Sequence, residues 1–258
     1  MLLRRVMENV KSENWFAVGV DFVIVVVGVF IGIQVANWNE ELSERKRERE
    51  ILRNITDDVR NDRLELASGK AFALHTIAAA NYALAAAGLE PVRSITMPLE
   101  DIPQLSGFYF SVPQPAEMAE DESRRLWSLS VVRYYPTQSN AALEALTAAG
   151  DLSLIRNAEL VRELQLYRQL WQGLEQSHES TYRPFRERAV YVGQEFGLSP
   201  FTEMDQGEYA ALLASNPELA SALRTLLEYT VLQNSQMEAL DNKAAELLRL
   251  LEGEVDDQ

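Results

Sequence analysis

The chain has 258 residues, with 24 lysines and arginines against 39 aspartates and glutamates, and its net charge at pH 7 is −15. This acidity argues against a nucleic-acid partner, because phosphate binding requires clustered basic side chains. The absence of cysteine excludes disulfides, thiolate zinc sites and cysteine nucleophiles, and two histidines leave little material for a histidine-based site. Residues 1–36 carry equal numbers of acidic and basic side chains, so the whole net charge belongs to residues 37–258.

Residues 15–38 are the most apolar part of the chain and predict a single membrane-spanning helix. As a helix this segment would extend roughly 35 Å, enough for a hydrocarbon core about 30 Å thick. Trp15 and Trp38 flank it, where interfacial aromatic side chains are typical. Residues 1–14 are expected to form an amphipathic tail. A cleaved signal peptide is disfavoured, because a cut after Ala36 would lack the usual small residues and a charged helix follows directly.

Two sets of residues inside the span indicate more than anchoring. Gly28, Gly32 and Ala36 recur every four residues, which places three small side chains on one helical face. Such a face lets another helix approach closely in lipid, so it predicts a helix–helix contact. Asp21 and Gln34 are polar groups within the apolar stretch. Asp21 either has a functional or pairing role in the membrane or extends to the near interface.

Residues 39–67 are expected to continue the membrane helix as a charged stalk. The stretch lacks proline and glycine, and acidic and basic side chains alternate over residues 44–50, which suits a solvated helix. Apolar residues at positions 52, 55, 59 and 66 lie near one face, which leaves a coiled coil with a second copy as an alternative. Asp62 in that seam argues against a long coiled coil.

Residues 68–258 predict a helical bundle domain outside the membrane, so the expected fold class is all-α. Five prolines within residues 89–120 exclude a long helix there and favour an ordered extended loop across the helical core. A partner-docking loop is the alternative for this segment. Residues 127–133 alternate briefly as a strand would, but a helical turn is equally compatible.

Several residues predict where helices begin and end. Asn140 and Asn157 are candidate N-caps, and Gly150 suits the left-handed residue that ends a helix. Pro184 must kink or end the long helix that follows Asn157.

The final helix has the most regular pattern in the chain. Asn216 and Pro217 suit its start, and apolar residues then recur at alternating spacings of four and three, which is typical of a bundle seam. Thr230 and Gln233 give the seam a polar middle. The seam residues are Leu219, Leu223, Leu226, Met237, Leu240, Leu247 and Leu251.

The chain contains little that indicates catalysis or a cofactor. Glu175 and His178 have the helical spacing of a di-iron ligand pair, but His75 has no acidic residue three positions before it, so the second pair is missing. Nucleotide-binding, hydrolase and zinc-protease motifs are also absent from the sequence. We therefore expect no enzymatic activity, no cofactor and no metal site.

Two stretches resemble a family of uncharacterised bacterial single-pass membrane proteins that share a domain of unknown function. The first is Asp21-Phe22 followed by Gly28-Val-Phe-Ile-Gly32-Ile-Gln-Val-Ala-Asn37-Trp38-Asn39-Glu40. The second begins at Ser139 and ends in Gly150-Asp-Leu-Ser-Leu-Ile155-Arg-Asn157. The resemblance implies a bacterial inner membrane and a C-terminal domain outside the cytoplasm. It brings no activity, cofactor or catalytic residue, and residues 89–135 carry no part of it.

These observations predict a non-enzymatic single-pass membrane protein that acts as an assembly or accessory subunit. Its expected partners are the lipid bilayer and either further copies of itself or a larger membrane complex, with no nucleic acid. A membrane-anchored helical ligand sensor and a membrane-tethered enzyme are the alternatives. The resemblance favours a periplasmic C-terminal domain, whereas the basic residues after the span lean slightly toward a cytoplasmic one.

Overall fold

A computed structural model describes residues 15–96, 109–112 and 118–256. The expected N-terminal tail, residues 1–14, and much of the proline-rich segment at 89–120 lie outside these described residues. The described chain is almost entirely helical, which confirms the all-α class.

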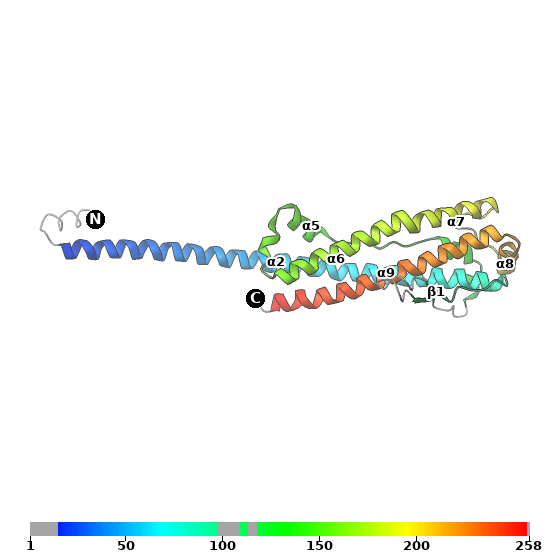
Figure 1. The fold of residues 1–258 in the computed structure, drawn as a ribbon, viewed down its shortest axis with the longest axis horizontal. Coiled ribbons are helices and arrows are strands. Elements are labelled where there is room, and N and C mark those ends of the chain that lie inside the picture. Colours follow the sequence, from blue (N-terminus) through cyan, green and yellow to red (C-terminus); the bar gives the residue numbers. More distant parts are fainter. Residues whose placement is uncertain (1–14, 97–108, 113–117, 257–258) are drawn as a thin grey trace, which may run out of the picture.

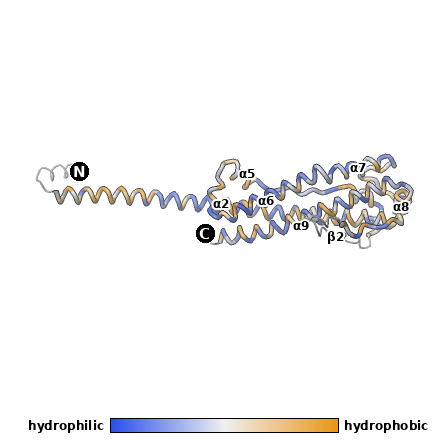
Figure 2. The backbone as a smooth tube through the Cα atoms, in the orientation of Figure 1, coloured by the Kyte–Doolittle hydropathy of each residue, from blue (hydrophilic) through white to orange (hydrophobic). Residues whose placement is uncertain are grey.

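The central element is α2, a single helix of 72 residues from Trp15 to Ala86. At about 1.5 Å per residue it is roughly 108 Å long. Its N-terminal part projects alone from the molecule, while its C-terminal part lies within the bundle (Figure 1). The projecting part is apolar near its free end and hydrophilic where it approaches the bundle (Figure 2). The helix ends where Gly88 takes a φ of +72° and the Leu89 amide donates to the Leu84 carbonyl.

Two further long rods complete the bundle. One consists of α6 (Ala158–Ser177), a π-helical turn (His178–Tyr182) and α7 (Arg183–Glu195) in continuous succession. Pro184 lies in the first turn of α7, directly after the wider π turn. The rod therefore continues past Pro184, where the sequence predicted a kink or an end. The other rod is α9 (Pro217–Asp256), which contacts α2, α6 and α7.

Shorter elements fill the ends and sides of the bundle. An antiparallel strand pair in the proline-rich segment aligns Ile95 with Phe110. The sequence pattern predicted no strand there. The residues at 127–133 that alternate in polarity are mostly helical. The short elements are β1 (Ser94–Thr96), β2 (Tyr109–Ser111), α3 (Glu120–Ser123), α4 (Leu126–Val131), α5 (Ala141–Ala148), the 3₁₀ turn η1 (Asp151–Leu154) and α8 (Gln206–Ser215).

The buried apolar residues form two clusters along the bundle. The cluster nearer the projecting helix joins α2, α5, α6 and the C-terminal half of α9, and it includes Leu52, Tyr167 and Leu247. The other joins the end of α2 to α4, α7, α8 and the N-terminal half of α9, around Trp127. All seven residues of the predicted α9 seam are buried, as are Thr230 and Gln233 between them.

The structure differs from the sequence-based domain boundaries at residue 68. The helix continues through Ser68-Gly69 without a break. Gly69 lies against Pro136 and Met237, where a larger side chain would collide with them. Leu52 and Ile55 are already buried in the bundle core. Much of the segment predicted as a charged stalk is therefore part of the bundle. Only about ten residues separate Trp38 from Glu48, the first buried residue of α2.

Two of the four predicted cap residues are confirmed. The Asn157 side chain accepts from the amides of Glu159 and Leu160, and Gly150 has a φ of +73°, so both predictions are confirmed. Asn140 makes no capping hydrogen bond with its side chain. The Asn216 side chain donates to the Leu212 carbonyl at the end of α8 instead of accepting from α9. Neither asparagine thus caps the helix that follows it.

Candidate functional site

The projecting half of α2 is the one candidate membrane span among the described residues. Its most apolar 18-residue window has a mean hydropathy of 2.5, and none of that window is buried. By length and composition, this helix could cross a membrane. A core helix of similar composition would be covered by other elements, whereas here large apolar side chains are exposed on every side, among them Val25, Phe30 and Ile33.

The sequence-predicted residues of the span take the positions expected of an unpartnered helix. A Cβ built on Gly28 or Gly32 meets no other atom within 4 Å, and Ala36 is exposed one turn further on. Asp21 is half-buried and Gln34 is exposed. Among the described residues, therefore, nothing packs against the small-residue face.

The structure describes the side chain of one of the two tryptophans that flank the span. Trp38 is 64% exposed, at the end of the apolar stretch. Trp15 is the first residue of α2, and its side chain lies outside the described residues.

Arg156 ties the bundle to α2 just beyond the span. Its guanidinium lies 3.5 Å from Glu41, 3.6 Å from Glu44 and 3.8 Å from Glu48, three carboxylates on successive turns of one face of α2. Its backbone amide also donates to Glu48 Oε1 at 2.8 Å, and the Glu48 side chain is only 1% exposed. A hydrogen bond to a buried carboxylate contributes more than an exposed ion pair, so the amide contact carries most of the attachment.

The neighbours of Arg156 connect this junction, the contact of the Arg156 turn with α2, to the other two long rods. Ile155 is buried in the core cluster nearer the span. Asn157 caps α6 and donates from Nδ2 to Glu254 Oε2 of α9 at 2.6 Å. The turn that carries the second resemblance motif thus joins α2, α6 and α9 at the end of the bundle that faces the span.

Two more carboxylates of α2 hold the segment before this turn. Asp58 accepts from the Ala142 amide at 3.0 Å, so it caps α5 from another helix in place of Asn140. Asp62 accepts from the Ser139 amide and, at 2.8 Å, from the Tyr167 hydroxyl. Burial raises the pKa of Asp62 to about 6. Sequence reasoning missed these roles, although an acidic residue in an apolar seam was a signal that Asp62 has a buried partner.

A second polar centre surrounds His178 in the middle of the bundle. His178 Nδ1 accepts from Gln233 Nε2 at 2.9 Å and from Arg133 Nη1 at 3.1 Å, so the proton of the neutral ring lies on Nε2. Tyr135 packs against the ring with 4.0 Å between centroids. Burial, followed by the charge of Arg133, lowers the pKa of His178 to about 4. Glu175 is exposed, so the spacing noted in the sequence does not form a ligand pair.

No group of three histidine, aspartate or glutamate side chains lies close enough to hold a metal ion among residues 15–96, 109–112 and 118–256. The His178 ring instead connects the π turn to α9 through Gln233 and to the segment after α4 through Arg133, while its buried Nε2 has no hydrogen-bond partner among the described residues. It has the features of a structural polar network.

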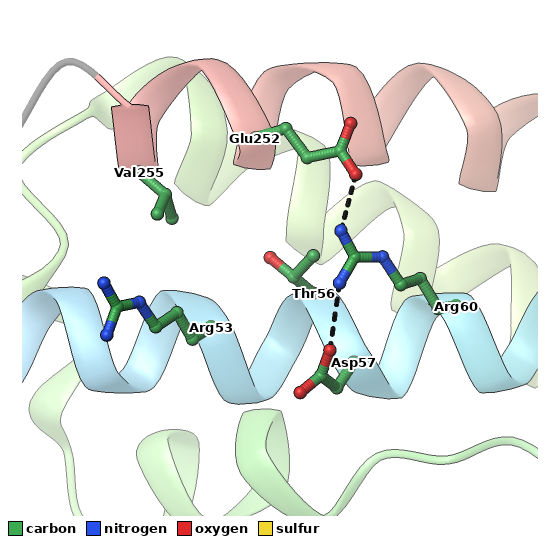
Figure 3. Close-up of a pocket in the computed structure, with 6 residues that line it drawn as sticks. All are labelled: Arg53, Thr56, Asp57, Arg60, Glu252 and Val255. Atoms are coloured by element: carbon green, nitrogen blue, oxygen red, sulfur yellow. Dashed lines mark hydrogen bonds and ion pairs between the residues drawn. The ribbon is translucent and has the colours of Figure 1, made fainter.

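An open pocket of about 510 Å³ lies between α2 and the C-terminal end of α9. Figure 3 shows Arg60 of α2 between Asp57 on its own helix and Glu252 of α9, at distances of 3.1 and 2.7 Å. Arg53, Thr56 and Val255 complete the lining. Two carboxylates already neutralise Arg60, so the pocket is poorly suited to bind an anion. The pair between Arg60 and Glu252 instead connects α2 to α9.

The comparisons with known proteins add no relative: no family model, no curated protein and no solved structure matches the chain.

Proposed function

We propose that this chain is a non-enzymatic single-pass membrane protein that acts as an assembly or accessory subunit. The observation that carries the proposal is the uncovered apolar half of α2, which continues without a break into a folded helical bundle. An apolar helix exposed on all sides is stable in lipid and is a liability in water. The continuous helix also supports an uncleaved anchor, because a cut at the end of the span would fall within α2.

The geometry beyond the span supports a bundle fixed close to the bilayer. About ten residues of helix separate Trp38 from Glu48, a rise of roughly 15 Å. Glu48 and Arg156 then clamp the bundle to this helix. A rigid connection of this length keeps the bundle near the membrane surface and transmits the orientation of the span to it. This arrangement suits a subunit that presents a helical surface to other membrane proteins.

The remaining parts of the proposal concern partners and location. The Gly28, Gly32 and Ala36 face supports a helix–helix contact within the membrane. The net charge of −15 supports a soluble domain repelled by anionic lipid. The resemblance noted above supports the bacterial inner membrane with a periplasmic bundle.

Alkaline carbonate extraction and a topology reporter test this proposal together. The full chain should remain in the membrane pellet after carbonate treatment and leave it only with detergent. A reporter fused after Gln258 should be active outside the cytoplasm. Release of the chain by carbonate would contradict the anchor, and a reporter active in the cytoplasm would contradict the location while leaving the anchor intact.

A further inference from the structure

Two arginines connect the segment after α4 to the rod formed by α6, the π turn and α7. Arg186 of α7 donates from Nε to the Val131 carbonyl at 2.6 Å. Arg133 donates from Nη1 to His178 Nδ1 of the π turn at 3.1 Å. The chain is extended between Val131 and Arg133, so their Cα atoms are roughly 7 Å apart. The two guanidiniums are therefore held in one region of the bundle, and both side chains are half-buried.

The Arg133 guanidinium experiences more repulsion than attraction from the charges around it. Burial lowers the pKa of Arg133, and the positive charge of Arg186 lowers it further. Tyr182 and Glu179 act in the opposite direction, each with a smaller effect than Arg186, and Arg183 adds a third positive charge. Arginine keeps its charge in a folded protein despite such a shift. The fold thus places like charges near each other, and an anion beside them would relieve the repulsion.

Two carboxylates of the same rod pair with a different arginine. Arg183 lies 2.7 Å from Glu179 and 2.9 Å from Glu187. Neither Arg133 nor Arg186 has an ion pair with a carboxylate in the part of the chain that the structure describes. Carboxylate partners are not scarce, because the chain has 39 acidic residues. The missing partner therefore distinguishes these two arginines from Arg183 beside them.

Both guanidiniums keep most of their hydrogen-bond donors for a ligand. A guanidinium carries five N–H groups in a rigid plane. Arg133 uses Nη1 on His178 and lies over the Tyr135 ring at 5.9 Å, whereas Arg186 uses Nε on the Val131 carbonyl. The Nη2 groups of the two arginines have no acceptor among the described residues. Because the existing contacts hold both side chains in place, less entropy is lost when a ligand binds.

We infer that Arg133 and Arg186 bind one small divalent oxyanion, with phosphate or dicarboxylate chemistry. The oxygens of both groups match the guanidinium fork, and two negative charges neutralise both arginines. A small free anion suits half-buried arginines better than an acidic side chain of a folded partner does. Lipid headgroups are excluded by distance, because α6 separates the π turn from the end of the bundle that faces the span by roughly 30 Å. This site goes beyond the proposed function and does not depend on it.

Equilibrium dialysis of the full chain in detergent tests the site, with radiolabelled inorganic phosphate and radiolabelled succinate as probes and sodium chloride to hold the ionic strength constant. At least one probe should bind saturably, at one site per chain. Arg133→Gln and Arg186→Gln should each weaken that binding by about tenfold or more, because each removes charge-assisted hydrogen bonds. Arg188→Gln on α7 and Arg60→Gln on α2 are the controls. Both arginines already pair with carboxylates, so their removal should leave binding within about twofold of the unmodified chain.

Modification of the unmodified chain by phenylglyoxal adds a measurement that needs no substitution, since Arg186→Gln also removes the contact with the Val131 carbonyl. With the probe at about ten times its Kd, reaction at Arg133 and Arg186 should slow by about tenfold, while reaction at Arg188 is unchanged. Peptide mass spectrometry locates the modified residues. Absence of saturable binding of either probe up to about 10 mM would overturn the inference. Binding that survives both substitutions, or equal protection of all arginines, would also overturn it.

Discussion

Replacing Gly193 in α7 with alanine should destabilise the bundle, although alanine is the better helix former. A Cβ at this position would lie 2.3 Å from Cζ2 and 2.6 Å from Cη2 of Trp127. The indole cannot move away freely, because it is 2% exposed and its Nε1 donates to the Ser199 carbonyl at 2.8 Å. Overpacking of this kind costs about 1–3 kcal/mol, against a helix-propensity gain of about 1 kcal/mol. The net expectation is a loss of up to about 2 kcal/mol.

Gly173 in α6 provides the matched control. A Cβ there meets nothing within 4 Å, so Gly173→Ala should gain the propensity term alone and stabilise the chain by about 1 kcal/mol. Thermal unfolding followed by circular dichroism in detergent should therefore shift the two midpoints in opposite directions by several degrees. If Gly193→Ala unfolds at or above the temperature of the unmodified chain, the packing of α7 against Trp127 described above is wrong.

The remaining predictions concern pH and the junction. The unfolded chain protonates His178 near pH 6.5 and the folded chain near pH 4, so this residue lowers stability as pH falls through that interval, by up to about 3 kcal/mol. Asp62 acts in the opposite direction, because its folded pKa is raised from 3.8 to about 6 and its ionisation above pH 4 favours unfolding. Denaturant titrations from pH 4 to 6 measure both effects. In His178→Gln, the free energy of unfolding should fall with rising pH relative to that of the unmodified chain. In Asp62→Asn, it should rise with pH more steeply than in the unmodified chain. Parallel curves for the two variants would contradict both assignments. Arg156→Ala should cost about 1 kcal/mol or less, because its ion pairs are exposed, yet hydrogen exchange should accelerate in the turn around it. Arg162→Ala, which removes a guanidinium that is 71% exposed, should leave exchange in that turn unchanged.

The sequence predicted the elements that depend on local pattern and missed those that depend on distant contacts. The seam of α9 and the apolar span follow from periodicity and length, which one segment contains by itself. The capping of α5 by Asp58 could not be read locally, because donor and acceptor are far apart in the chain. Asn140 looked like the cap since it precedes the helix, but a carboxylate from α2 occupies that role.

The packing of α2 against the rest of the bundle also depends on contacts that are distant in the sequence. Leu52 and Ile55 were visible as an apolar face, yet whether that face meets a second copy or the same chain depends on where α6 and α9 pack. The helix runs through the predicted boundary at residue 68, because packing of Gly69 against Met237 overrides the tendency of glycine to weaken a helix.

The proposed function requires that residues 15–38 cross a bilayer and that the bundle lie outside it. Accessibility of single cysteines along α2 to a membrane-impermeant maleimide measures this most directly in a chain without cysteine. Val26→Cys should resist labelling in sealed membranes and react only after detergent is added, whereas Leu64→Cys should react when the bundle's side of the membrane faces the reagent. Labelling of Val26→Cys at the rate of Leu64→Cys, in intact membranes, would contradict the account.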